Sequence, residues 1–277
     1  MFECVPNLAE GRNLTVLDDL SASAGASLRD RHHDPAHHRS VFTLINDPEP
    51  LERDVRTLVE RAFTALSLVE HAGVHPRFGV VDVVPFVALD PDERPRARAM
   101  RDRTASWIAR TFEVATFLYG PLADGSTRTL PDVRRLAFGE LAPDFGPGEP
   151  SAKHGAVAVG ERPVLVAWNI WLARTSLAEA RALAREVRNP SVRALGFRVG
   201  DEVQVSCNLL DVTACPPSTV YDQVARLAGA SRISRTELVG LFPRALLERE
   251  DPRRWSQLDL SPERTIEAAL QRGSASL

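Results

Sequence analysis

Lysine, cysteine and long apolar runs are all scarce in this chain of 277 residues. The three cysteines (Cys4, Cys207 and Cys215) form no CxxC pair and leave an odd count, which favours reduced thiols over a disulfide framework or a zinc site. No apolar run approaches the ~18 residues of a membrane span, and no secretory signal is visible at the start. These absences predict a cytoplasmic protein that does not cross a membrane.

The chain also has no large excess of acidic or basic residues. The 34 basic and 37 acidic residues give a formal net charge of −3, without the basic excess on which many nucleic-acid and membrane-surface binders depend. Lys153 is the only lysine, so it stands out among arginines as a compact ammonium group. The chain is long enough to form one large or two ordinary domains without a disulfide or a metal to stabilise them. We therefore expect small-molecule partners rather than nucleic acid or a membrane.

The order of local patterns predicts an α/β (α+β) fold. From residue 164 onward the patterns run strand, helix, strand, strand, helix, strand, with a capping box of Ser176 and Glu179 at the first helix. This order builds a four-stranded antiparallel sheet with both helices on one face, the ferredoxin-like arrangement. Residues 1–163 repeat a similar order with more insertions. We expect two subdomains, 1–163 and 164–277.

Several segments carry clear local signals. The most amphipathic helix is predicted over 51–71, after a strand pair that joins at Asp34 and Pro35. Residues 121–155 are rich in Gly and Pro and predict a long irregular segment with one short helix. Residues 155–172 predict two strands around a short turn.

Polar and apolar side chains alternate along the predicted strand 202–209. One face of this strand has the apolar residues Val203, Val205, Cys207 and Leu209, which we expect to pack against the helices. The other face has Gln204, Ser206 and Asn208, which we expect to line an open face of the sheet. If the open faces of two mainly antiparallel sheets meet, they enclose a polar groove. We expect this groove to be the binding site.

Six of the seven histidines fall in two clusters. Histidine is both the usual acid/base near neutral pH and the commonest metal ligand. Gly73 and Pro76 place His75 in a loop, which argues against a zinc helix that would use His71 and His75. A metal hydrolase that uses the cluster His32, His33, His37 and His38 remains an alternative at this point.

Eight segments of the chain resemble the glutamate formimidoyltransferase (formiminotransferase) family. They occur in order from residue 3 to residue 243: ECVPNLAEGRN, HHRSVFTL, HAGVHPRFGVVDVVPFV, FLYG, PDFGP, GAVAVGERPVLVAWNI, QVSCNLLD and ELVGLFP. The blocks around His75 and around Gly155–Asn169 are the most specific. The resemblance implies a monofunctional transferase without a cyclodeaminase domain.

The resemblance implies a reaction, an architecture and a set of residues. The family transfers a formimidoyl group between N-formimidoyl-L-glutamate and tetrahydrofolate in histidine breakdown, uses no metal, has two facing subdomains around a groove, and forms homodimers. The catalytic histidine of the family falls on His75. Its folate-binding stretch falls on Gly155, Ala156, Val157, Ala158, Val159, Gly160, Glu161, Arg162, Pro163 and Val164.

Other residues are candidates for contact with the substrates. Lys153 lies two residues before Gly155, in the Gly/Pro-rich segment, and is expected to contact the glutamate tail of the folate. Arginine forks match carboxylates, so Arg39, Arg77 and Arg162 are expected to bind carboxylate groups. The remaining candidates for substrate contact are His32 and Asn208.

The chain departs from many family members at Val74, His38 and His32. These departures leave the identity of the donor and of the acceptor open. A folate-binding protein that kept the scaffold and lost the activity is the alternative outside the enzyme class.

Overall fold

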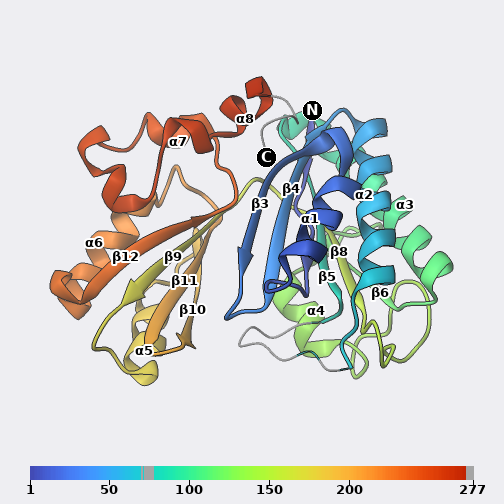
Figure 1. The fold of residues 1–277 in the computed structure, drawn as a ribbon, viewed down its shortest axis with the longest axis horizontal. Helices are drawn as coiled ribbons and strands as arrows, with labels where there is room; N and C mark the ends of the chain where they lie inside the picture. Colours follow the sequence, from blue (N-terminus) through green and yellow to red (C-terminus); the bar gives the residue numbers. More distant parts are fainter. Residues whose placement is uncertain (70, 72–77, 273–277) are drawn as a thin grey trace. The chain divides into compact units, whose positions relative to one another are not determined.

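The computed structural model describes residues 1–69, 71 and 78–272, and in it the chain divides into two compact units. The first unit spans 1–164 and the second begins at Leu165. Each unit contains one β-sheet, labelled in Figure 1. The predicted α+β class with ferredoxin-like subdomains is confirmed. No helix among the described residues is long and apolar enough to cross a membrane.

The described part of the first unit contains an eight-stranded mixed sheet. Its strands, in chain order, are β1 (Phe2–Cys4), β2 (Asn7–Leu8), β3 (Leu28–Asp34), β4 (Arg39–Asn46), β5 (Val81–Ala88), β6 (Thr116–Pro121), β7 (Thr127–Arg128) and β8 (Val157–Glu161). Strands β3, β4, β1 with β2, and β5 are neighbours and antiparallel, which is the ferredoxin-like order. Strand β8 lies parallel to both β5 and β6 and extends that core.

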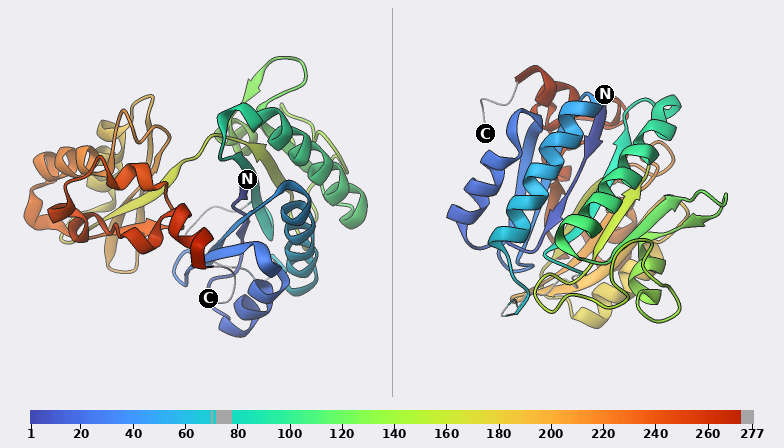
Figure 2. Two further views of the ribbon diagram at one scale, coloured as in Figure 1. Left: turned by 90° about the horizontal axis from the view of Figure 1, so that it is seen from above. Right: turned by 90° about the vertical axis from the view of Figure 1, so that its right-hand side faces the viewer.

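The helices of the first unit cover the two faces of its sheet unequally. They are α1 (Leu14–Ser23), α2 (Pro48–Ala65), α3 (Arg94–Phe112) and α4 (Leu130–Leu136). Helices α1, α2 and α3 share one apolar core with the strands, and Figure 2 shows α2 and α3 side by side along that face. Val133 of α4 packs into a separate cluster with Val83 and Phe117. This cluster partly covers the opposite side of the sheet, which we call the α4 face.

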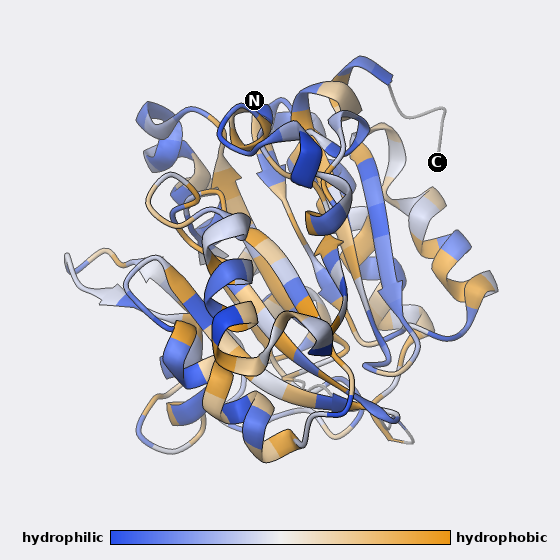
Figure 3. Ribbon diagram, turned by 90° about the vertical axis from the view of Figure 1, so that its left-hand side faces the viewer, coloured by the Kyte–Doolittle hydropathy of each residue, from blue (hydrophilic) through white to orange (hydrophobic). Residues whose placement is uncertain are grey.

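The second unit has the predicted ferredoxin-like order. It contains β9 (Val166–Leu172), α5 (Leu177–Val187), β10 (Val192–Val199), β11 (Glu202–Leu209), α6 (Pro217–Ala228), β12 (Ile233–Val239), α7 (Arg244–Leu247) and α8 (Ile266–Arg272). Its sheet order is β10-β11-β9-β12, and every pairing is antiparallel. The capping box of Ser176 and Glu179 starts α5 as predicted. In Figure 3 the helices of this unit alternate between hydrophobic and hydrophilic segments, as amphipathic surface helices do.

Short 3-10 helices connect these elements: η1 (Gly25–Ser27), η2 (Pro91–Glu93), η3 (Ala230–Arg232), η4 (Pro252–Arg254), η5 (Ser256–Leu258) and η6 (Pro262–Arg264).

One sequence-based expectation was wrong about where a helix ends, and another was right about its two strands but not about the turn between them. The helix predicted over 51–71 ends at Ala65, because Leu66 is extended and the amide of Leu68 donates to the carbonyl of Lys153 (2.8 Å). The two strands predicted over 155–172 are both present, but they belong to different sheets, since β8 pairs with β5 and β6 whereas β9 pairs with β11 and β12. Their connection is therefore the link between the units and not a hairpin turn.

Candidate functional site

Polar side chains gather on the α4 face at the centre of the first sheet. Leu8 and Phe42 pack into the core under α1, α2 and α3, so the alternation of a strand places their neighbours Asn7 and Val41 on the α4 face. Arg39 lies two residues before Val41 and shares that face. The sheet thus brings the start of the chain and the strand that follows the first histidine cluster together at one place.

Asp82 on β5 is the centre of this polar group and is only 2% exposed. Its carboxylate accepts hydrogen bonds from the backbone amide of Phe78 (2.7 Å) and from Arg134 Nη2 of α4 (2.6 Å). Arg39 Nη2 lies 3.3 Å from the same carboxylate oxygen that Arg134 contacts. One buried carboxylate therefore ties together β4, α4 and the residue that precedes β5 by three positions.

Arg39 is held by polar partners in a largely desolvated position. Its Nη2 donates to Asn7 Oδ1 as well as lying beside Asp82. Burial lowers the pKa of Arg39 to about 10; Asp82 counteracts this shift, and nearby Arg134 adds to it. At neutral pH Arg39 is still a cation, so it can bind a carboxylate.

The described residues on both sides of segment 72–77 are anchored beside this group. On the C-terminal side, Phe78 donates its amide to Asp82, and its carbonyl accepts from the amide of Ala156 (2.9 Å). On the N-terminal side, the ring of His71 stacks on the ring of His38 with centroids 4.0 Å apart. The predicted residues His75 and Arg77 themselves lie outside the described residues.

The turn between β3 and β4 is fixed by the segment that starts α1. Glu10 Oε1 accepts from the amides of Gly11 (2.8 Å), Arg12 (2.7 Å) and Asn13 (3.0 Å). The amide of Gly11 also donates to Nδ1 of His38 (3.1 Å), and a Cβ at Gly11 would lie 2.3 Å from the carbonyl oxygen of Asp34. Glycine is therefore required there, and its amide holds the His38 ring that stacks on His71.

The stretch from Gly155 to Val164 is mostly interior. The side chains of Ala156, Val157, Ala158 and Val159 are 0% exposed and pack against both faces of the sheet. A Cβ at Gly160 would lie 2.0 Å from the ring of Tyr119, so this glycine makes room for a flat ring of the protein itself. The accessible positions lie at the two ends: exposed Lys153, two residues before the stretch, and Arg162 to Val164 at its close.

The other predicted contact residues lie on different strands. His32 on β3 pairs with Val41 of β4, so β4 lies between His32 and Asn7 of β2. Asn208 is exposed on β11 of the second unit. Arg162 is half-buried after β8, and its charge counteracts the rise in the pKa of Glu3 that burial causes.

Comparison with known proteins decides the family. A family model described as "Formiminotransferase domain, N-terminal subdomain" matches residues 1–162. The chain is 31% identical to a glutamate formimidoyltransferase of Streptococcus pyogenes serotype M1, over 90% of this chain and 91% of that protein. The chain belongs to the formiminotransferase family. The resemblance and the expected transferase class are thereby confirmed.

Two further relatives frame the extent of this similarity. A glutamate formimidoyltransferase of Thermoplasma acidophilum is 27% identical, over 89% of each chain. A formimidoyltransferase-cyclodeaminase of Sus scrofa is 32% identical over 90% of this chain, but the match covers 51% of that protein. The chain therefore spans about half the length of this relative.

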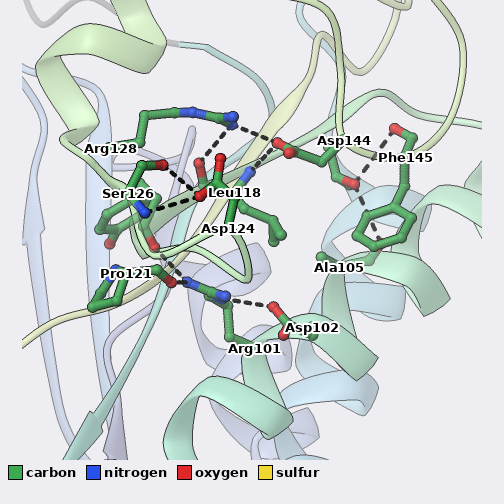
Figure 4. Close-up of polar contacts among 12 residues, drawn as sticks. Arg101, Asp102, Ala105, Leu118, Pro121, Asp124, Ser126, Arg128, Asp144 and Phe145 are labelled. Carbon is green, nitrogen blue, oxygen red and sulfur yellow. Dashed lines mark hydrogen bonds and ion pairs between the residues drawn. The ribbon is translucent and has the colours of Figure 1, made fainter. Parts of the chain in front are cut away.

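The segment PDFGP contacts and fixes the strand that carries Tyr119. Asp144 Oδ2 accepts from the amide of Leu118 (2.7 Å) and from Arg128 Nη1 (2.7 Å), as Figure 4 shows. Arg101, which is 2% exposed, donates to the carbonyls of Tyr119 (3.1 Å) and Pro121 (2.7 Å). These contacts fix β6 and with it the ring of Tyr119 over Gly160. Burial raises the pKa of Tyr119, which keeps its phenol neutral.

Sequence reasoning missed three residues of the polar group: Asn7, Asp82 and Arg134. Asp82 had a usable signal, because it is the only charged residue in the β-branched run 79–88, where a buried charge requires partners. Arg134 had none, since it is one arginine among many in a Gly/Pro-rich segment.

A metal cluster and a hollow in the second unit are the other possible sites in the described structure. In the described ranges no three His, Cys, Asp or Glu side chains come together as a metal site requires. A hollow of about 660 Å³ lies among the C-terminal helices, lined in part by Arg244, Leu247, Trp255, Thr265 and Ala268. It contains no residue of the resemblance segments, so the α4 face of the first sheet is the better candidate.

Proposed function

We propose that this protein transfers a formimidoyl group between N-formimidoyl-L-glutamate and tetrahydrofolate. One observation carries the proposal: four resemblance segments far apart in the chain meet at the two ends of segment 72–77, which contains His75. The meeting points are the contacts of Gly11 with His38, of His38 with His71, and of Ala156 with Phe78.

His75 is proposed as the general acid/base. Transfer forms a bond from N5 of the pterin to the amidine carbon and breaks the bond from that carbon to the glutamate nitrogen. One proton must leave the attacking amine and one must reach the departing amine. An imidazole with an ordinary pKa near 6.5 can accept the first and donate the second at neutral pH. Asp82 would act as a positioning residue, because it holds the amide three residues after His75.

Arg39 is proposed to bind a substrate carboxylate, and Arg77, His32 and Asn208 remain predicted contacts. The folate is proposed to meet the ends of the stretch from Gly155 to Val164, because its middle is interior. A cytoplasmic location and a homodimer are likewise proposed from the family.

Lys153→Ala is expected to weaken folate binding about tenfold at low salt, the effect of losing one charge-assisted hydrogen bond. Lys153 is exposed, so the loss should shrink as salt rises and screens the pair. Titration calorimetry at two salt concentrations measures both effects. Arg226→Ala, an exposed cation on α6, is the matched control and should leave binding unchanged. Unchanged folate binding by Lys153→Ala at low salt would remove this lysine from the site.

The proposal is tested by incubating the protein with tetrahydrofolate and N-formimidoyl-L-glutamate and assaying formimidoyl-tetrahydrofolate. A folate-binding protein without activity would give a normal binding isotherm and no product. Product formation with both substrates, and none when either is omitted, is the expected result.

A further inference from the structure

The guanidinium of Arg134 is only partly used by contacts within the described structure. Its Nη2 donates to Asp82 (2.6 Å), which is its ion-pair partner among the described residues. Its Nε is buried and has no acceptor in the described ranges, while the side chain as a whole remains 29% exposed. A guanidinium has five N–H donors in one plane. The hydrogen bond from Nη2 fixes the group of Arg134, and its Nε–H has no acceptor in the described ranges.

The charges around Arg134 favour an anion. Asp82 is shared by Arg134 and Arg39, so this three-residue cluster contains two positive charges and one negative charge. The two guanidiniums are close, because both contact the same Asp82 oxygen at 3.3 and 2.6 Å, and this proximity adds to the lowering of the Arg39 pKa. A bound carboxylate would relieve this repulsion and would accept from the unused N–H groups.

We propose that Arg134 binds a carboxylate of the amino-acid substrate, with Asp82 as the positioning residue that orients its guanidinium. The inference deepens the proposed function and rests on it for the identity of the substrate. A carboxylate matches the planar fork of arginine bidentately. Arg39 is shared between Asn7 and Asp82, whereas the hydrogen bond of Arg134 in the described structure goes to Asp82, and Arg134 lies on α4 with 29% of its side chain exposed.

Arg134→Gln tests the proposal, and Arg135→Gln is its matched control on the same helix. Arg135 is 65% exposed and pairs only with Asp132 at 3.2 Å in the described structure, so its loss removes the same charge outside the polar group. Arg134→Gln is expected to raise KM for N-formimidoyl-L-glutamate about 10- to 100-fold, as loss of a charge-assisted bond does. KM for tetrahydrofolate and kcat should stay within about twofold of the parent for both variants.

A binding measurement without folate separates this inference from the proposed function. Calorimetric titration with glutarate, a plain dicarboxylate, should show binding by the parent and by Arg135→Gln and a loss of at least about tenfold in Arg134→Gln. If the parent forms no product, the proposed function fails while the glutarate comparison still decides the site. Equal glutarate affinity in the parent and Arg134→Gln would overturn the inference.

A purely structural role for Arg134 predicts a different pattern. It would lower the stability of Arg134→Gln and leave KM and glutarate affinity unchanged in the folded fraction, and that result overturns the proposal. If Arg134→Gln does not fold, Arg134→Lys keeps the charge and loses the fork. The expected result for Arg134→Lys is a smaller rise in the KM for the amino-acid substrate, and an unchanged KM would contradict bidentate binding.

Discussion

His75→Ala is expected to lower kcat on the order of 10²–10⁴-fold, the usual contribution of a positioned acid/base. The affinity for tetrahydrofolate should change little, because the proposed folate contacts lie at the ends of the stretch from Gly155 to Val164. The fall in kcat is expected because, without the imidazole, water must take and supply the two protons of the transfer. Steady-state kinetics with both substrates varied, together with a folate binding isotherm, measures the two quantities separately.

His33→Ala is the control for this experiment. His33 lies on β3 and pairs with Ser40, which is fully buried. Because neighbours along a strand point to opposite faces, His33 lies on the face opposite to the α4 face. Its kcat should stay close to that of the parent. Near-full turnover by His75→Ala would remove His75 from the mechanism.

Asp82→Asn is expected to destabilise the protein by about 3 kcal/mol, because removing the negative member of a buried ion cluster leaves uncompensated charges. The two guanidiniums of Arg39 and Arg134 would then face each other without the carboxylate that both contact. The amide of Phe78 would also lose a charged acceptor. We expect kcat to fall as well, since Phe78 follows the segment with His75. Urea unfolding of the two proteins measures the loss of stability.

Asp124→Asn provides the comparison for Asp82→Asn. Asp124 is exposed and bonds locally to the amide and hydroxyl of Ser126, as seen in Figure 4. Its urea midpoint should move far less than that of Asp82→Asn. Equal midpoints for Asp82→Asn and the parent would show that the cluster does not stabilise this face.

The secondary structure could be predicted wherever local periodicity controls it. The ferredoxin-like order of the second unit follows from alternation and capping alone, as the Ser176–Glu179 box illustrates. The end of α2 could not be predicted, because the amide of Leu68 bonds to Lys153, a residue far along the chain. The apolar run of β8 indicates burial on both faces but carries no information about which strands it joins.

The candidate site was predictable only in part. The resemblance pointed to His75 and the stretch from Gly155, and the fit of a guanidinium to a carboxylate pointed to Arg39. The same pattern did not reveal that this stretch is mostly interior, because a run of small apolar residues fits a core strand as well as a ligand contact. Arg134 and Asp82 become partners only through the fold, 52 positions apart in sequence.

Transfer of an isotopically labelled formimidoyl carbon tests the central claim most directly. The parent and His75→Ala are incubated side by side with labelled N-formimidoyl-L-glutamate and tetrahydrofolate, and the label is followed to both products. The account predicts that the parent moves the label to the folate and releases one glutamate for each folate formed, while His75→Ala transfers it far more slowly. Label that stays on glutamate with the parent enzyme, or reaches the folate equally fast with His75→Ala, would contradict it.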